Sequence, residues 1–264
     1  MRAHLVQLDI AWEDHGANFR EVDRLLTHAG VGAGDLVVLP EMFSTGFSLN
    51  TAVTADRDGT VLEYLRGLAT DLGAWVQGGR TVHECDCTHA TNEAPVIDPS
   101  GRVVLSYRKI HPFSYGREAE RFVGGSKVMT YWWGEGADAT AGNGLAVCPA
   151  ICYDLRFPEL FRRGLDMGAE CYAVGACWPK ARQHHWRSLL VARAIENQAI
   201  VLGVNRTGRD PTLEYAGGSI AVGASGEVLG ELGDDQTVLS VEVDVEAMRA
   251  WRAKFPAWKD RKLG

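Results

Sequence analysis

The sequence has no long apolar run, no strongly basic segment and no stretch of low complexity. Without about 18 consecutive apolar residues it offers no candidate transmembrane helix, and its first residues, MRAHLVQLDIAW, lack the apolar segment of a secretory signal peptide. The net charge is −7 and no basic stripe is present, which argues against nucleic acid or an anionic membrane surface as a partner. We therefore expect a cytoplasmic protein that binds neither.

No Pro/Ser-rich or charged linker and no internal repeat divides the 264 residues. A chain of this length can form one large α/β domain or two small ones, and the missing linker favours a single domain over residues 1–264. The six cysteines of a cytoplasmic protein are expected to be reduced. Each is then a free thiol, a metal ligand or a nucleophile.

Common signatures of catalysis and metal binding are absent or unsupported. There is no G-x-S-x-G, and GVGAGD lies between an expected helix and a strand, the reverse of a dinucleotide fingerprint. The run HECDCTH places His83, Cys85, Cys87 and His89 at alternate positions. On a strand such side chains lie about 7 Å apart, too far to surround one zinc ion, and although a loop could gather them, we expect a hairpin tip here. We predict no metal site.

Apolar periodicity predicts strands that alternate with helices, followed by hairpins near the end of the chain. Helices are expected at residues 17–30, 61–73, 157–168 and 184–198, and from about Val245. Strands are expected at 5–12, 35–41, 74–82, twice within 91–110, and at 144–153, 171–178, 199–208, 217–231 and 237–244. This order is typical of an α/β fold with a mixed sheet, or with two sheets covered by helices.

Three polar residues stand where apolar strands end. Glu41 follows the run LVVLP, Lys109 ends RVVLSYRK, and Cys152 closes GLAVCPAIC. A buried carboxylate or ammonium group must be paired, because burial of an unpaired charge is expensive. If the three strand ends meet in one crevice, they supply a base, a cation and a nucleophile.

Each of these residues also has an ordinary explanation. Glu41 fits a strand that has reached solvent, Lys109 a lysine that snorkels at a sheet margin, and Cys152 a buried core thiol. A helix expected from near Phe157 would place Cys152 close to a helix N-terminus, where the macrodipole and free N–H groups stabilise a thiolate and a developing oxyanion. Position alone leaves these alternatives open.

Several longer stretches resemble the nitrilase superfamily of carbon–nitrogen hydrolases. They are LPEMFSTGF (39–47), YRKIHPF (107–113), CYDLRFPELFR (152–162), ARAIENQAIVLGVNRTG (192–208) and GGSIAVGASGEVL (217–229). The resemblance runs from the first strand to the last helix and implies an αββα sandwich, in which two mixed β-sheets are flanked by helices. PEMFSTGF and CYDLRFPELF are most similar to the ω-amidase branch, whose members hydrolyse the terminal amide of 2-oxo acid amides such as 2-oxoglutaramate.

The resemblance implies a catalytic role for each of the three strand-end residues. Glu41 would act as general base and acid, Lys109 would stabilise the oxyanion, and Cys152 would be the nucleophile. The backbone N–H of Tyr153 is the second oxyanion donor that the resemblance implies.

Many members of the superfamily carry a second glutamate after the lysine, a few residues before a glycine. In GREAERFVGG the spacing to Gly125 gives that role to Glu118, with Glu120 as the alternative. The family's usual leucine before this loop is Pro112 here, so both glutamates stay under consideration.

The reaction implied is hydrolysis of a small acid amide, with release of ammonia and a thioester on Cys152 as intermediate. It requires no metal or organic cofactor, and the partner is a small-molecule amide. One alternative is a superfamily hydrolase of another C–N substrate, such as an N-carbamoyl compound or a modified peptide amide. Another is a catalytically inactive binding or scaffold protein, although the intact Glu–Lys–Cys set argues against it. The resemblance also implies a homodimer.

The residues that would hold a substrate carboxylate are not assigned by the sequence. Arg117, Arg156, Lys180 and Arg182 lie near the motifs, but we expect Arg156 to pair with a nearby acid and brace its turn, and the others to be surface charges. Trp178 follows a strand in ACWP and is a weak candidate for the pocket wall, with a core position as its alternative.

Overall fold

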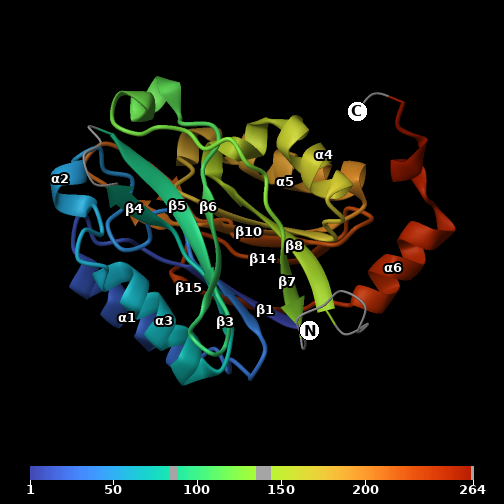
Figure 1. Ribbon diagram of the computed structural model, residues 1–264, viewed down its shortest axis with the longest axis horizontal. Coiled ribbons are helices and arrows are strands. Elements are labelled where there is room, and N and C mark those ends of the chain that lie inside the picture. Colours follow the sequence, from blue (N-terminus) through green and yellow to red (C-terminus); the bar gives the residue numbers. More distant parts are fainter. Residues whose placement is uncertain (84–88, 135–143, 263–264) are drawn as a thin grey trace.

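The computed structural model describes residues 1–83, 89–134 and 144–262, and two β-sheets stacked face to face form its centre (Figure 1). Strand order in the seven-stranded first sheet is β15-β1-β2-β3-β5-β4, and β6 also pairs with β5. Its strands are β1 (Arg2–Gln7), β2 (Leu36–Val38), β3 (Trp75–Gln77), β4 (Arg80–His83), β5 (Ala90–Ile97), β6 (Val103–Arg108) and β15 (Thr237–Glu242). The sheet is mixed, because β1, β2 and β3 run parallel and the other pairings are antiparallel.

The second sheet has six strands in the order β14-β13-β10-β9-β8-β7 and is also mixed. Its strands are β7 (Tyr131–Gly134), β8 (Gly144–Ile151), β9 (Cys171–Ala176), β10 (Ile200–Asn205), β13 (Ile220–Val222) and β14 (Val228–Glu231). Strands β8, β9 and β10 are parallel and read as nearly continuous apolar runs because both of their faces are covered. A separate hairpin is formed by β11 (Thr207–Arg209) and β12 (Glu214–Ala216).

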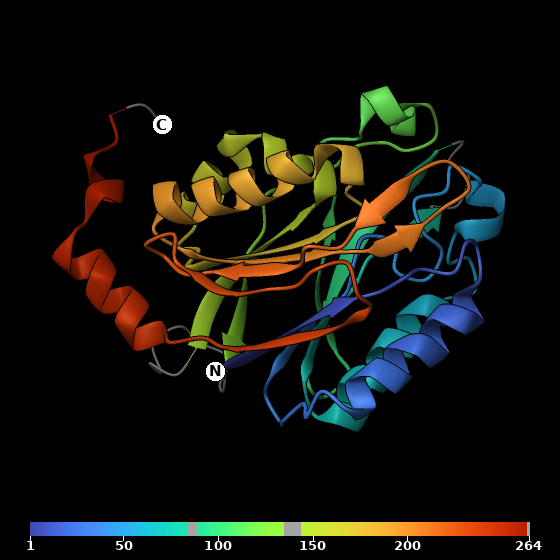
Figure 2. The same cartoon turned by 180° about the vertical axis from the view of Figure 1, so that it is seen from behind.

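Helices cover the outer face of each sheet (Figure 2). Helices α1 (His15–Thr27) and α3 (Thr60–Leu72) lie on the first sheet, and α4 (Pro158–Asp166) and α5 (Gln183–Asn197) lie on the second. The short helix α2 (Thr51–Thr54) precedes α3. The resulting order of layers, helix–sheet–sheet–helix, is the αββα sandwich expected from the sequence.

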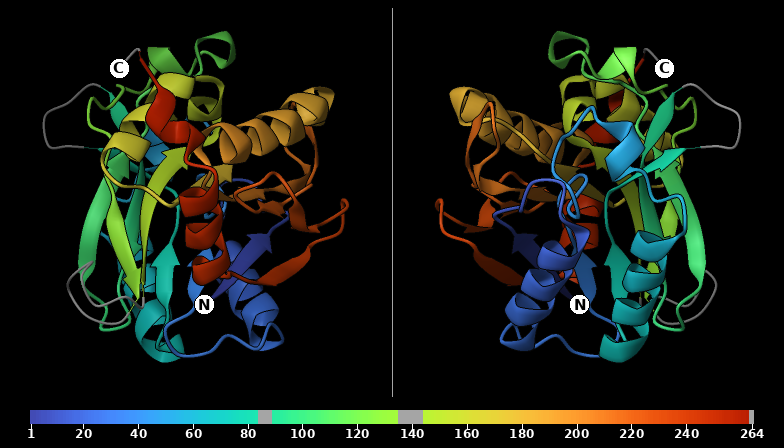
Figure 3. Two further views of the ribbon diagram at one scale, coloured as in Figure 1. Left: turned by 90° about the vertical axis from the view of Figure 1, so that its right-hand side faces the viewer. Right: turned by 90° about the vertical axis from the view of Figure 1, so that its left-hand side faces the viewer.

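The C-terminal helix α6 (Val245–Lys254) lies along one edge of the sandwich (Figure 3). Asp244 caps its N-terminus by accepting a hydrogen bond from the Ala247 N–H at 2.8 Å. Arg249 then binds Glu170, at the start of β9, with N–O distances of 2.7 and 2.8 Å. The segment after α6 continues through a 3-10 turn, η6 (Ala257–Asp260).

Local sequence explains where several helices begin. Asp14 caps α1 through the Ala17 N–H at 2.9 Å, and Pro158 occupies the first turn of α4, where a missing N–H costs nothing. The buried side of α1 carries Val22, Leu25 and Leu26, spaced so that they face the first sheet.

Most predicted elements are confirmed, with shifts at their ends. The expected strand over residues 74–82 is divided into two segments, β3 and β4, which pair with β5 in one continuous register on either side of Gly78 and Gly79. The predicted last helix from about Val245 is confirmed as α6. Of the zinc-like run, Cys85 and Cys87 lie outside the described residues, and the described His83 ring hydrogen-bonds to Thr51 Oγ1 at 3.1 Å.

No helix in the described residues is long and apolar enough to cross a bilayer. The four cysteines among those residues are free thiols, namely Cys148, Cys152, Cys171 and Cys177.

Two glycines let three chain segments meet around Glu41. A Cβ atom on Gly79, which precedes β4, would lie 2.5 Å from the Met42 nitrogen, and one on Gly175 in β9 would lie 2.7 Å from the Leu39 carbonyl oxygen. Neither distance is compatible with a side chain. Both sheets therefore approach the segment after β2 closely, and this approach places Glu41 between them.

Candidate active site

The ends of three strands meet between the sheets. Glu41 lies three residues after β2, Lys109 directly follows β6, and Cys152 directly follows β8, so the first two come from one sheet and the third from the other. Lys109 Nζ lies 2.7 Å from Glu41 Oε1, and both side chains are almost fully buried. Cys152 is 8 % exposed, and the charges of Glu41 and Lys109 both act on its thiol. The crevice expected from the sequence therefore exists, and neither charge is a surface charge.

Lys109 is held by a second carboxylate. Its Nζ atom donates to Glu118 Oε2 at 2.8 Å and to Oε1 at 3.1 Å, and Glu118 is fully buried. Glu118 also accepts from the Phe113 N–H at 2.5 Å. Glu120 is instead exposed and forms a surface ion pair with Arg117 at 2.8 Å. Of the two glutamates considered from the sequence, Glu118 faces Lys109.

Asn92 joins the two carboxylates and was missed by the sequence analysis. Its Nδ2 donates to Glu41 Oε1 at 2.8 Å and to Glu118 Oε1 at 3.1 Å. It lies in β5, all eight residues of which are buried. A polar amide within a fully buried strand was the available signal, because a buried polar side chain requires hydrogen-bond partners.

The charges around Lys109 keep it protonated. Burial alone would lower the pKa of Lys109, but the neighbouring carboxylates of Glu118 and Glu41 outweigh burial and raise the pKa well above its usual value. Glu41 is in turn fixed from the other side by the Cys177 N–H, which donates to Oε2 at 3.0 Å. The Cys177 thiol donates to the Glu41 backbone carbonyl at 3.2 Å.

The backbone at Cys152 makes a sharp turn from β8 into the 3-10 helix η4 (Cys152–Arg156). Cys152 has φ = 46°, in the left-handed region that residues with a Cβ rarely adopt. Such strain costs about 1–3 kcal/mol and persists only where the surroundings impose it. Met42, directly after Glu41, has φ = 44°. Both turns carry a site residue.

The Cys152 thiol is neutral at rest, which corrects the expectation that a helix terminus stabilises a thiolate. Burial and the charge of Glu41 raise the pKa of Cys152 well above its usual value, and the opposing effect of Lys109 does not compensate. A proton acceptor is therefore needed before the sulfur can attack, and Glu41 is the carboxylate whose charge acts most strongly on that thiol.

Asp154 anchors the Cys152 turn to the lysine strand. Its buried carboxylate accepts from Tyr107 Oη at 2.7 Å and from the Ile151 N–H at 3.1 Å. The other oxygen accepts from the His111 N–H at 3.0 Å and lies 2.8 Å from the His111 ring. One carboxylate thus ties the segment that carries Lys109 to the turn that carries Cys152.

Arg193 supports the same turn from helix α5. Its guanidinium donates to the Leu155 carbonyl at 2.8 and 3.2 Å and pairs with Glu196 at 2.9 Å. Arg193 is buried and Glu196 is half-buried, so this ion pair has a structural role.

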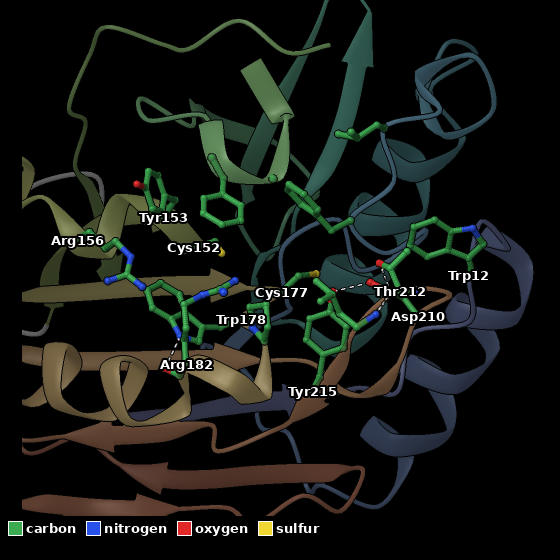
Figure 4. A pocket seen from close by; sticks show the side chains of 16 residues that line it. Trp12, Cys152, Tyr153, Arg156, Cys177, Trp178, Arg182, Asp210, Thr212 and Tyr215 are labelled. Carbon is green, nitrogen blue, oxygen red and sulfur yellow. Dashed lines mark hydrogen bonds between the residues drawn. The ribbon is translucent and has the colours of Figure 1, made fainter. Parts of the chain in front are cut away.

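A pocket of about 340 Å³ opens above Cys152 (Figure 4). Its walls are mostly aromatic and aliphatic, with three charged groups. The lining residues are Trp12, Phe47, Leu49, Phe113, Gly116, Cys152, Tyr153, Arg156, Cys177, Trp178, Pro179, Arg182, Asp210, Thr212, Leu213 and Tyr215. Trp178, the weak candidate from the sequence, lies in this wall, fixed by its indole N–H to the Arg182 carbonyl at 2.8 Å.

Arg156 does not pair with an acid, contrary to the sequence-based expectation. Among the described residues no carboxylate lies within 4.0 Å of it; the guanidinium lies over the Trp178 ring at 4.8 Å and donates to the His185 ring nitrogen at 3.2 Å. Asp154, two residues earlier, braces the turn instead.

No group of three potential metal ligands from histidine, cysteine, aspartate and glutamate occurs within residues 1–83, 89–134 and 144–262. The arrangement around Lys109 is suited to covalent chemistry, because a thiol, a carboxylate and a buried cation interact electrostatically at one place.

Known proteins with similar sequences or structures match along nearly the whole chain. Residues 2–253 match the family described as carbon–nitrogen hydrolase. "Omega-amidase YafV" of Yersinia enterocolitica is 35% identical over 262 residues, covering 98% of this chain and 96% of that protein. "2-oxoglutaramate amidase" of Bacillus subtilis is 32% identical over 257 residues, covering 97% and 95%. The structure of XC1258 from Xanthomonas campestris, a CN-hydrolase superfamily protein with an arsenic adduct in its active site, superimposes with a TM-score of 0.89 at 33% identity, covering 100% and 98%.

Replacing Asp154 should destabilise the protein. Asp154→Asn leaves the donors of Tyr107, Ile151 and His111 without a full set of acceptors, so we expect the free energy of unfolding to fall by about 3 kcal/mol. Asp71→Asn, an exposed position near the end of α3, should change it by less than about 0.5 kcal/mol. Urea unfolding of both variants measures this. Equal stability of the two would contradict the anchoring role of Asp154.

Proposed function

The chain belongs to the carbon–nitrogen hydrolase family and is a hydrolase of amides, and we propose that it cleaves the terminal amide of a short carboxylic acid such as 2-oxoglutaramate. The family and the resemblance to the ω-amidase branch, inferred from sequence motifs, are confirmed by the curated relatives. The observation that carries the proposal is the buried Glu41–Lys109–Glu118 cluster, whose charges act on the Cys152 thiol beneath a small, largely apolar pocket.

The first half of the proposed reaction forms a thioester. Glu41 takes the proton of the Cys152 thiol, and the sulfur attacks the amide carbon to give a tetrahedral oxyanion. The proton on Glu41 then passes to the amide nitrogen, the C–N bond breaks and ammonia leaves. A carboxylate is suited to this task because the thiol it serves is neutral at rest.

The second half releases the acid. A water molecule takes the place of ammonia, Glu41 accepts one of its protons, and the oxygen attacks the thioester carbon. The C–S bond breaks, the proton returns to the Cys152 sulfur, and the carboxylic acid departs. Charge and atoms balance without an oxidant, a metal or an organic cofactor.

Lys109 and the backbone N–H of Tyr153 are the proposed oxyanion donors. Lys109 Nζ makes one contact to Glu41 and two to Glu118. The longest of the three, at 3.1 Å to Glu118 Oε1, is the one that we propose Lys109 exchanges for a hydrogen bond to the substrate oxyanion. Removal of one such donor typically costs about 100-fold to 1,000-fold in kcat. Glu118 positions the ammonium group, and Trp178 forms part of the substrate wall.

The homodimer and the cytoplasmic location stay predictions. They follow from the family resemblance and from the composition of the chain, and neither enters the proposed mechanism.

The substrate is tested by ammonia release from 2-oxoglutaramate, glutamine and an N-carbamoyl amino acid. We expect 2-oxoglutaramate to be the preferred substrate and Cys152→Ala to abolish its hydrolysis, because the nucleophile is lost. Cleavage of the carbamoyl compound alone, with release of carbon dioxide, would overturn the substrate but keep the family chemistry. Full activity of Cys152→Ala would overturn the mechanism, and an inactive wild-type protein would favour a binding or scaffold role.

The two neighbouring glutamates provide a matched test of the site. Glu118→Gln removes the charge that holds Lys109, and we expect amidase kcat to fall roughly 100-fold. Glu120→Gln breaks only an exposed pair with Arg117 and should leave kcat within about twofold. Steady-state ammonia release measures both. Comparable losses in the two variants would show that Glu118 does not position the lysine.

A further inference from the structure

The pocket above Cys152 contains two cations that no acid neutralises. Arg156 and Arg182 both line it, from η4 and from the 3-10 turn η5 (Lys180–Arg182). Across the part of the chain that the structure describes, no carboxylate lies within 4.0 Å of either guanidinium. By contrast, Lys180 beside Arg182 is paired with Glu214 at 3.5 Å.

The third charged group of the pocket is already occupied. Asp210 accepts hydrogen bonds from Tyr215 Oη at 2.6 Å, from the Leu213 N–H at 2.7 Å and from Thr212, at 2.7 Å from its N–H and 2.9 Å from its hydroxyl. These bonds outweigh the effect of burial and keep the pKa of Asp210 below its usual value. This carboxylate shapes the β11–β12 hairpin and is not directed to either arginine.

The two arginines differ in how firmly they are held. Arg156 lies over the rings of Trp178 and Tyr153, at 4.8 and 5.8 Å, and donates to His185. The Arg182 guanidinium lies 5.5 Å from the centre of the Phe113 ring, and no hydrogen bond from it to a described residue is present. Its five N–H donors are therefore available to a ligand.

Backbone contacts hold Arg182 in place while its side chain stays available. The Trp178 indole donates to its carbonyl at 2.8 Å, and its own N–H donates to the Pro179 carbonyl at 2.9 Å. In Figure 4 the side chains of Arg156 and Arg182 both extend into the space beside Cys152 and Trp178. They approach that space from two different segments.

We propose that Arg182, flanked by Arg156, is the specificity-determining residue that binds an anionic group at the end of the substrate opposite the amide. The inference rests on the proposed amidase function and deepens it, because it assigns the residue that selects substrates with a carboxylate at the end opposite the amide. Two like charges facing one largely apolar pocket repel each other and lose hydration, and a carboxylate relieves both costs. The planar guanidinium fork also matches a carboxylate in two parallel hydrogen bonds.

The same arrangement disfavours other amides. A neutral alkyl amide would leave the Arg182 guanidinium without a hydrogen-bond partner, and an amide with a cationic tail would be repelled by both arginines. A binding site rejects a ligand that leaves its buried polar groups unpaired more strongly than one that merely lacks a methylene group.

Glutaramate and its methyl ester provide a matched pair of substrates, because they differ in the tail charge and keep the amide. Ammonia release from both is measured for the wild-type protein, Arg182→Gln, Arg182→Lys and the control Lys180→Gln. The ratio of kcat/KM for the acid to kcat/KM for the ester should be about 30-fold lower in Arg182→Gln than in the wild-type protein. We expect this mainly because KM for the acid rises. Arg182→Lys should restore part of the ratio, and Lys180→Gln should leave it unchanged.

Binding of glutarate provides a second measurement that does not depend on turnover. Trp178 lies in the pocket wall, so binding of glutarate should change the tryptophan fluorescence of the wild-type protein. We expect the Kd for glutarate to be at least about tenfold higher in Arg182→Gln. Thermal unfolding of each variant verifies that it is folded.

The outcomes separate the inference from the function on which it rests. If the wild-type protein releases ammonia from neither compound, nor from 2-oxoglutaramate, the proposed function fails. If it prefers the acid and Arg182→Gln keeps that preference and the glutarate affinity, the role of Arg182 is overturned and the amidase stands. If the wild-type protein cleaves acid and ester equally well, the anionic substrate class is overturned.

Discussion

A lysine ammonium group between two carboxylates, enclosed by two β-sheets, is the interaction on which the rest of the site depends. Lys109 contacts Glu41 at 2.7 Å and Glu118 at 2.8 Å, and all three side chains are almost fully removed from solvent. Breaking a buried pair by removing one partner typically costs about 3–5 kcal/mol, because the remaining charge has no compensation. Asn92 fills the remaining gap between the carboxylates. The cluster therefore fixes the position of the base and of the cation together.

The second sheet brings the nucleophile to this cluster. Strand β8 ends at Ile151, and Cys152 follows it in a left-handed turn, where the charge of Glu41 acts on the thiol. Asp154 holds that turn against the lysine strand, so the distance between the two sheets is set by hydrogen bonds as well as by apolar packing. Gly175 removes the side chain that would otherwise keep the sheets apart near Glu41. Strain at Cys152 is thus maintained by contacts from both sheets.

The sequence predicted the fold class, and most elements, because apolar periods of two and 3.6 residues are strong in this chain. It also singled out Glu41, Lys109 and Cys152, since polar residues at the ends of apolar strands are visible without a structure. Asn92 was not visible, because an amide inside a strand has many ordinary explanations. The contacts of Arg156 were predicted wrongly, since the partner of a long cationic side chain depends on which segments fold beside it.

The choice between Glu118 and Glu120 also depends on the tertiary structure. Both lie in one 3-10 turn, η2 (Glu118–Glu120), and the orientation of that turn decides which of them is buried. The protonation state of Cys152 likewise depends on burial and on the charges that surround it, which no local motif reveals. Local pattern identified the chemistry-bearing residues, and tertiary packing determined how each is charged and held.

The most direct test of this account is the pH titration of the Cys152 thiolate, followed by its ultraviolet absorbance as the difference between the wild-type protein and Cys152→Ala. Because burial and Glu41 raise the pKa of Cys152, the thiol is protonated below that pKa, so no thiolate signal should appear at neutral pH. Replacing Glu41 by glutamine should move the titration to lower pH, since the carboxylate charge is removed. A thiolate already present at neutral pH in the wild-type protein would contradict the account, because Glu41 would then have no proton to take.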